Sequence, residues 1–428
     1  MNNRFALKAT RTLLLGGVAT LSLMAAAMPA QAAAASGASA AEIAQLRAQI
    51  QALSDRLAAQ EAAQARAEAA QARADAKILT LPTQAEVGAL ASASPPPAAK
   101  PSWADSTVVS GRMYFDLTTI NQETDGNKVH PTGTGFDIKR FYIGVDHKFN
   151  DMFSGNVTTD FQYSSAISST EVYIKKAYLQ AKFSDALTVR VGSTDLPWVP
   201  FSEGLYGNRF IENTLIDRTK FGTSADWGVH ASGKLGGMVS YAIAVVDGAG
   251  YKAPLRSKGM DVEARVSITP IENVTLAVGG YTGKLGKSKE GVTTYHTANR
   301  FNAIAAYTDK TVRVGVEYFK AEDWGNVTSV ASDSAEGYSV FGSYQINPKF
   351  NVFGRYDRVE PNQDTVAGRQ DDYYNAGVTY SAFKNIDLSL VYKHEAVDKG
   401  PISSSNGTIG GAVDGSYDEV GVFGQYRF

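Results

Sequence analysis

The sequence contains no cysteine among its 428 residues. A disulfide framework, a cysteine nucleophile and a thiolate metal site are therefore excluded, and stability has to come from a core, a bilayer or an assembly. The formal net charge is only −2, so nucleic acid is not expected as a partner. Beyond the first 32 residues, the chain also lacks any apolar run of the roughly 20 residues that a transmembrane helix needs.

Histidine is scarce, and the five residues are scattered along the chain at His130, His147, His230, His296 and His394. Neither an H-E-x-x-H metal motif nor a G-x-S-x-G nucleophile motif is present. We therefore expect no catalytic residue, no cofactor and no metal site, and no enzyme. A barrel-bound lipase that pairs a serine with His147 or His230 is the remaining enzymatic alternative. The plainer interpretation makes each histidine an interface or loop residue.

The first 32 residues have the features of a secretory signal peptide. Arg4, Lys8 and Arg11 precede an apolar stretch from Leu13 to Met28, and Ala30-Gln31-Ala32 offers a small-x-small cleavage site. A membrane-anchoring helix is the alternative, but the stretch is short for a span. We expect an exported chain.

Residues 33–79 are rich in Ala, Gln, Glu and Arg, and they predict a helical coiled coil that forms a stalk. The repeat alternates spacings of three and four at Ile43, Leu46, Ile50, Leu53 and Leu57, and continues through Gln60, Gln64, Ala67, Gln71, Ala74 and Ile78. A lone solvated helix is the alternative. The Ile/Leu heptads favour two strands, whereas the Gln and Ala layers suit three. Residues 80–106 contain Pro95, Pro96, Pro97 and Pro101 and predict a stiff, extended linker.

From residue 107 to residue 428 the hydrophobic period changes to two, which indicates β-strands. Sixteen alternating segments can be counted, from TVVSGRMYFDLTTI (107–120) to YDEVGVFGQYRF (417–428). The connections alternate between tight turns (FNDM, FSDA, LGGM, TPIEN, TDK, NPKF, AFKN) and loops that are mostly ten or more residues long. This rhythm predicts an all-β fold, a 16-stranded antiparallel transmembrane β-barrel with short turns at one end and long loops at the other. A soluble two-sheet protein is the alternative.

Aromatic residues stand at both predicted borders of this barrel. Phe149, Phe153, Phe183, Phe350 and Phe383 lie beside tight turns, and Tyr163, Tyr318 and Tyr417 lie near the long loops. The last residue, Phe428, ends an apolar stripe that also includes Val420, Val422 and Tyr426. We expect Phe428 to close the barrel, by pairing the last strand with the first, and to act as an assembly signal whose ring faces lipid.

Several short motifs resemble the phosphate-selective porin O and P family. They are FDIKRFYIGVDHKF with Lys139, Arg140, Gly144 and Val145, VYIKKAYLQAKF with Lys176, Ala177, Tyr178 and Leu179, and VRVG from Val189 to Gly192. The resemblance extends from about residue 107 onward and implies a sixteen-stranded, trimeric barrel in the outer membrane of a Gram-negative bacterium. The predicted stalk resembles that of dicarboxylate-uptake porins instead.

If apolar positions face lipid, their neighbours face the lumen. Inward basic candidates are Arg112, Arg140, Lys148, Lys176, Lys182, Arg190, Arg265, Arg300, Arg313, Arg355, Lys393 and Arg427. Inward acidic candidates are Asp116, Asp146, Asp160, Asp226, Asp261, Glu263, Glu317, Asp357, Asp387 and Glu419. The near balance favours a mixed wall over the focused positive ring of a dedicated anion channel. About half of these charges are expected to pair and only hold the wall. Arg112, Arg140, Lys176 and Arg190 are the wall residues most expected to face solute.

The longest loop, LPWVPFSEGLYGNRFIENTLIDRTKF (196–221), is too apolar for a freely exposed loop. We expect it to fold into the lumen and set a constriction, with Arg209, Arg218 and Lys220 as the main solute contacts and Glu203 and Asp217 beside them. An external cap or a trimer contact is the alternative.

These features together predict an outer-membrane porin for passive diffusion of small hydrophilic solutes and ions. Its expected partners are outer-membrane lipid, further copies of itself in a homotrimer, and small polar or anionic solutes. One alternative is a selective channel for phosphate or another small anion. Another is a structural protein whose stalk tethers the outer membrane to the cell wall.

Overall fold

The computed structural model describes residues 103–165 and 169–428, together with helical residues at 51–52, 54–56, 58–59, 61–62, 65–66 and 69. The predicted signal peptide, the positions of the predicted heptad repeat and most of the linker lie outside the described residues. Within the linker, Trp103–Ser106 forms a single 3₁₀ turn, η1, immediately before the first strand. Among the described residues, none of the helices is long and apolar enough to cross a bilayer.

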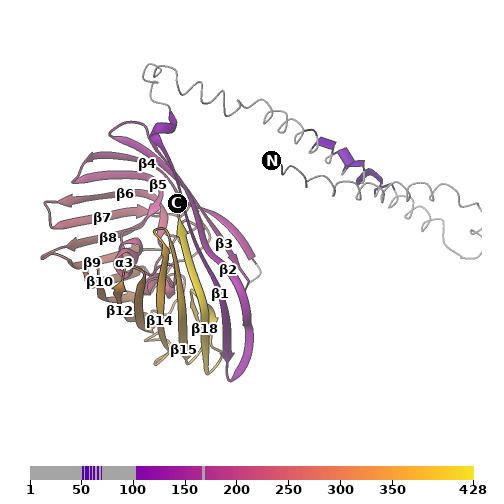
Figure 1. Ribbon diagram of the computed structural model, residues 1–428. Coiled ribbons are helices and arrows are strands. Elements are labelled where there is room, and N and C mark those ends of the chain that lie inside the picture. The colour runs from indigo at the N-terminus through magenta and orange to yellow at the C-terminus, as the bar shows by residue number, and fades with distance from the viewer. Residues whose placement is uncertain are drawn as a thin grey trace, which may run out of the picture. The chain divides into compact units, whose positions relative to one another are not determined.

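Sixteen of the strands between residues 103 and 428, apart from the undescribed residues 166–168, close into an antiparallel barrel (Figure 1). Their bounds are β1 Thr107–Thr124, β2 Asn127–Lys148, β3 Phe153–Ser164, β4 Ser169–Ser184, β5 Leu187–Asp195, β6 Ala225–Leu235, β7 Val239–Val246, β8 Asp261–Ile268, β9 Val274–Gly283, β10 Ala298–Thr308, β11 Val312–Glu322, β12 Ser334–Asn347, β13 Phe350–Glu360, β14 Gln370–Phe383, β15 Ile386–Asp398 and β18 Asp414–Arg427. Two short strands, β16 Ile402–Ser404 and β17 Gly407–Ile409, form a separate hairpin. The predicted all-β barrel is confirmed.

The tight turns that the sequence predicts all join consecutive strands at one end of the barrel, which we call the short-turn end. The opposite, long-loop end carries the remaining connections. One of these differs from the prediction, because β1 and β2 extend past the expected loop and meet at Asp125-Gly126. Both residues have positive φ, 48° and 75°, as a two-residue type I′ hairpin turn requires. The predicted polar loop is therefore mostly paired strand.

The barrel closes between β1 and β18, which lie side by side in Figure 1. Phe428 continues this pairing: its N–H donates to the Gly111 carbonyl (3.0 Å), and the Gly111 N–H donates to the Phe428 carbonyl (3.1 Å). The Phe428 ring covers Gly111, where any larger side chain would collide with it, and remains 61% exposed. The ring thus fills the space left by glycine on the outer face of the closing strand pair.

The outer face of the barrel is apolar and the inner face carries the polar side chains. Outward residues such as Val109, Leu117, Val157, Leu179 and Val191 are exposed, and so are the five phenylalanines beside the tight turns. Tyr417 departs from its predicted place at the outer border, because it lies on the inward face of β18 and is only 4% exposed. A continuous apolar band of this kind needs lipid to cover it.

Candidate functional site in the barrel lumen

The segment between β5 and β6, residues 196–224, lies inside the barrel and contains two short helices, α3 (Val199–Tyr206) and α4 (Leu215–Arg218). Most of its buried apolar side chains form one cluster with inward residues of β9 to β13, while Phe210 and Ile211 belong to a second cluster. The first cluster includes Trp198, Val199, Tyr206, Leu215, Ile216 and Phe221 from the segment, with Ile304, Phe319, Phe341 and Val359 from the wall. Each fully buried side chain of this size contributes roughly 1.5–3 kcal/mol. We call this segment the lumen loop.

Polar contacts from the wall fix the lumen loop in place. The Trp198 indole N–H donates to the Glu317 carboxylate (2.6 Å), and the Trp198 backbone N–H donates to Glu263 (2.8 Å). The Arg265 guanidinium lies 3.8 Å from the Phe201 ring centre and donates to the Pro197 carbonyl. Arg313 donates to the carbonyls of Gly204 and Leu205 at the end of α3. These inward arginines, expected only to line the wall, hold the loop.

Arg218 was expected to contact solute, and this is wrong because the side chain is completely buried. Its guanidinium makes ion pairs with Asp357 (2.9 Å), Asp371 (2.9 Å) and Glu395 (3.0 Å), and it lies over the Tyr373 ring. Burial alone would lower the pKa of Arg218, but the carboxylates raise it well above its ordinary value. Arg218 therefore fastens α4 to the wall.

A second buried group joins the lumen loop to the last connection of the barrel. The Lys393 ammonium lies between Glu212 (3.2 Å) and Glu419 (3.0 Å), and the Ser405 hydroxyl, in the turn between β16 and β17, donates to Glu212 (2.7 Å). Burial would raise the pKa of Glu212, but Lys393 and Lys139, with the hydrogen bonds from Ser405 and the Asn213 N–H, lower it. The β16–β17 hairpin is thereby held at the long-loop mouth.

Opposite the covered wall, two cavities remain open, and Arg209 lines both of them. Its guanidinium pairs with Glu203 (2.5 Å) and lies 3.7 Å from Asp217. Burial would lower the pKa of Arg209, but Glu203 and other neighbours raise it well above its ordinary value. Burial raises the pKa of Asp217, and Arg209 opposes this shift. We call this group the junction, since Arg209 borders both cavities.

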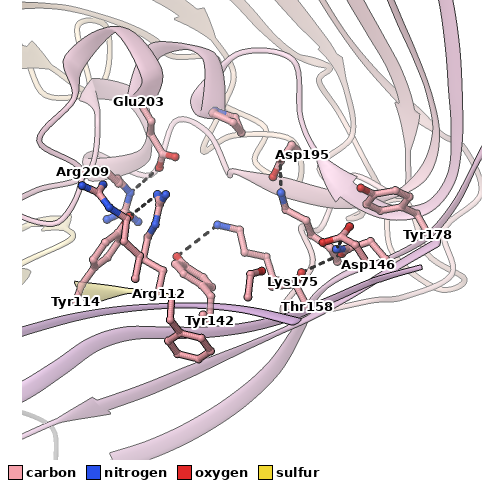
Figure 2. Close-up of a pocket in the computed structure, with 18 of the residues that line it drawn as sticks. Arg112, Tyr114, Tyr142, Asp146, Thr158, Lys175, Tyr178, Asp195, Glu203 and Arg209 are labelled. Carbon is pink, nitrogen blue, oxygen red and sulfur yellow. Dashed lines mark hydrogen bonds and ion pairs between the residues drawn. The ribbon is translucent and has the colours of Figure 1, made fainter. Parts of the chain in front are cut away.

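The cavity at the short-turn end has a volume of about 630 Å³. Figure 2 shows Glu203 and Arg209 together on its loop side, with Lys175 extending from the wall towards Tyr142. The Lys175 ammonium is 3.4 Å from the Tyr142 hydroxyl and 4.7 Å from its ring centre. Lys175 is only 8% exposed, and within the part of the chain that the structure describes no carboxylate lies within 4.0 Å of its ammonium. It is a buried cation that borders a cavity and has no carboxylate in direct contact.

The cavity at the long-loop end has a volume of about 210 Å³. Its basic lining residues are Lys139, Arg140, Arg209, Lys220 and Lys252, and its acidic ones are Asp116, Asp137, Glu212 and Glu419. Arg140 lies 3.8 Å from Asp160, and the Lys139 ammonium donates to the Ile211 carbonyl (3.0 Å) of the lumen loop. The lining is mixed in charge, as predicted for the wall.

Strict alternation in the strands missed Lys139 and Lys175 as inward residues. In β2, Arg140 and Ile138 pair with two consecutive residues of β1, so Lys139 between them is skipped. In β4, Lys176 and Ile174 pair with two consecutive residues of β3, so Lys175 is skipped. Each strand therefore contains a β-bulge, and both members of each basic pair reach the lumen. A signal was present in the sequence, because an ionised lysine next to an inward one would otherwise face lipid, which is costly.

The other predicted residues lie as follows. Glu203, Arg209, Arg112 and Lys176 line the short-turn-end cavity, where Lys176 pairs with Asp195 (2.5 Å). Arg140 and Lys220 line the long-loop-end cavity. Asp217 contacts Arg209 without lining either cavity, and Arg190 stacks on Tyr178 and donates to Gln180. The structure thus brings most of them to one side of the lumen.

Comparison with solved structures reveals the same fold at low identity. The chain is similar to an anion-selective porin from Comamonas acidovorans (11% identity, TM-score 0.57, covering 76% of this chain and 99% of that one). It is also similar to the outer-membrane channel DcaP of Acinetobacter baumannii (13%, 0.53, 75% and 97%) and to the trimer form of OmpT of Vibrio cholerae (14%, 0.51, 75% and 99%). No curated protein matches it.

Residues 109–330, more than half of the chain, match the family model described as phosphate-selective porin O and P. That family consists of channels rather than enzymes. The closed barrel, its apolar outer face and the polar cavities inside it agree with this assignment. The chain therefore belongs to the phosphate-selective porin O and P family, and it is an outer-membrane porin of a Gram-negative bacterium that forms a water-filled channel for passive diffusion.

Proposed function

We propose that solutes cross this porin through the long-loop-end cavity, past the junction, and into the short-turn-end cavity. The observation that carries the proposal is that Arg209 lines both cavities, so a solute passing between them has to pass its guanidinium. Glu203, Arg209, Asp217 and Lys220 are the proposed contacts of the constriction. Arg112, Arg140, Lys176 and Arg190 form the proposed wall of the path, and Lys139 and Lys175 are added to them.

The proposed selectivity is a mild preference for anions among small hydrophilic solutes. Acidic side chains line both cavities, and three cations along the path, Arg140, Lys176 and Arg209, have carboxylates within 4.0 Å. Paired charges of both signs orient water and admit many polar solutes, whereas only a focused set of unpaired cations gives strong selection. Lys175 supplies one such cation, buried beside the cavity.

A phosphate-selective channel is the second candidate, and Lys175 is also the observation that favours it. A buried ammonium without a carboxylate in direct contact is stabilised when a small anion enters the adjoining cavity. Arg112 and Lys176 line the same cavity within reach of such an anion. We rank this candidate second because Asp146, Asp195 and Glu203 line that cavity too.

We also propose that the protein works as a homotrimer anchored in outer-membrane lipid. The trimer form of OmpT has the same barrel fold, and the polar, small-residue part of the predicted heptad repeat suits a three-stranded stalk. The apolar outer face supplies the surface for lipid. Chemical crosslinking of the protein in membranes, which should give a ladder ending at three copies, tests the oligomer.

Planar-bilayer recordings in a potassium chloride gradient test the channel and its selectivity. We expect stepwise conductance with a reversal potential shifted mildly towards that of chloride. Lys175→Gln should reduce this shift, whereas the double variant Lys176→Gln with Asp195→Asn, which removes an ion pair at constant net charge, should leave it unchanged. Strong anion selectivity, together with a current that millimolar phosphate blocks, would favour the second candidate. An absence of conductance would refute both candidates.

A further inference from the structure

A third cavity, of about 440 Å³, lies at the long-loop end beside the mouth of the channel. It is formed by parts of the lumen loop and of four external connections: those between β9 and β10, β11 and β12, β13 and β14, and β15 and β18. Lys220 lines both this cavity and the long-loop-end cavity of the proposed path. The third cavity, which we call the mouth pocket, therefore borders the route into the channel.

The mouth pocket has an apolar side built from rings and branched side chains. It is lined by Phe221, Leu285, Trp324, Pro361, Pro401 and Ile402. The Trp324 indole is held in one orientation, since its N–H donates to the Lys220 carbonyl (3.0 Å) and its ring centre lies 5.0 Å from that of Tyr281. Such a fixed aromatic wall is preorganised to receive a flat apolar group.

The charged side of the mouth pocket is basic. Neither Lys220 nor Lys287 has a carboxylate within 4.0 Å of its ammonium among residues 103–165 and 169–428. The carboxylate that lines the pocket, Asp333, is already occupied. It accepts hydrogen bonds from the Asn362 amide (2.8 Å), the Asp364 backbone N–H (3.0 Å) and Thr365.

The backbone of Lys220 also has an unusual conformation. Its φ is 65°, in the left-handed region that residues other than glycine seldom adopt, and the hydrogen bond from Trp324 holds its carbonyl there. Lys220 thus lines the pocket and also holds the Trp324 ring through its own carbonyl. Strained backbone of this kind persists where surrounding contacts impose it, often at ligand sites.

We propose that the mouth pocket binds amphipathic organic anions, that is, carboxylates attached to an aromatic ring or another flat apolar group. The ring contacts Trp324, Phe221 and the prolines, and the carboxylate contacts the ammonium groups of Lys220 and Lys287. An inorganic anion would leave the apolar side unused, and a cation would meet two ammonium groups against the single carboxylate of Asp333. The proposal rests on the proposed function, since Lys220 would pass a captured anion to the channel.

Isothermal titration calorimetry on the full-length protein in lipid nanodiscs tests the pocket, with phenylacetate, acetate and 2-phenylethylamine as probes. Phenylacetate should bind about tenfold more tightly than acetate, because acetate has no ring to bury against the apolar side of the pocket. The amine should not bind measurably. The double variant Lys220→Gln with Lys287→Gln should weaken phenylacetate binding about tenfold. Circular dichroism establishes that each variant retains its β-structure.

The matched control is Arg256→Gln with Lys289→Gln, which removes two exposed positive charges at the long-loop end, one between β7 and β8 and one between β9 and β10, without altering the pocket lining. We expect the control to bind phenylacetate as the wild type does. Equal binding of phenylacetate and acetate, or equal losses in the control and the pocket variant, would overturn the proposal. Because calorimetry does not depend on conduction, a wild-type protein that binds phenylacetate but carries no current would refute the proposed function and leave the pocket standing.

Discussion

The two sides of the lumen are built by the same strand alternation and yet differ in what their charges do. On the covered side, Arg218 of the lumen loop and the wall residues Lys393 and Arg300 are buried, and each is paired with at least one carboxylate. On the open side, Arg112 and the Lys176–Asp195 pair line a cavity. Inward charge therefore does not identify a solute contact, because what packs over the charge decides its role.

The energetic consequences of the two settings also differ. Removing one partner of a buried ion pair leaves the other charge uncompensated and costs about 3–5 kcal/mol, whereas an exposed pair contributes about 0–1 kcal/mol. The covered side should therefore control stability and the open side selectivity. Three substitutions or conditions test this division.

The largest effect is expected for Arg218→Met, on the covered side. Its removal leaves Asp357, Asp371 and Glu395 without their shared cation, and we expect the free energy of unfolding to fall by about 3–5 kcal/mol. Guanidinium-induced unfolding in lipid vesicles measures the change. Arg112→Gln, on the open side, is the control and should cost less than about 1 kcal/mol. Similar losses in both variants would contradict the division.

An intermediate effect is expected for Arg209→Ala at the junction. Glu203 and Asp217 then lack their cation, and the channel should shift towards cations. A unit charge about 4 Å from a passing ion contributes about 1 kcal/mol in water, with opposite signs for an anion and a cation, so the anion-to-cation permeability ratio should fall by up to about thirtyfold. The reversal potential in a salt gradient gives this ratio. Adding Glu203→Gln should restore much of it, and an unchanged ratio in Arg209→Ala would place the path elsewhere.

The smallest effect concerns pH and Asp217. Because its pKa is raised, chiefly by burial, Asp217 takes up a proton at a higher pH than an ordinary aspartate. Acidification therefore removes negative charge beside Arg209, and anion preference should increase as the pH falls, starting above the pH at which an ordinary aspartate titrates. The reversal potential, followed through this range, measures the change. In Asp217→Asn the reversal potential should no longer change with pH through this range. If the change remains in this variant, another group causes it.

Sequence patterns predicted the barrel closely because each step depends on local chemistry. The strand Phe350–Glu360 has the predicted bounds, since alternating residues lie between turn residues on both sides. The apolar content of residues 196–221 predicted a segment inside the lumen, where Trp198 and its neighbours are buried. The hairpin at Asp125-Gly126 had a sequence signal as well, because Asp-Gly favours a two-residue turn.

Long-range packing explains what sequence patterns missed. Whether Arg209 or Arg218 faces solute depends on carboxylates that lie more than a hundred residues further along the chain, such as Asp357 and Glu395. The inward direction of Lys175 depends on a bulge, which shifts the alternation by one residue. No local pattern specifies which wall the lumen loop covers.

On the proposed path Arg209 lies between two cavities, which makes the channel comparable to resistors in series. In such a circuit the narrowest element accounts for most of the total resistance, and enlarging a wide element changes the current little. Shortening the external connections should therefore alter the conductance much less than changing one side chain at the junction. The external connections can then vary in sequence while the electrical properties of the channel stay the same.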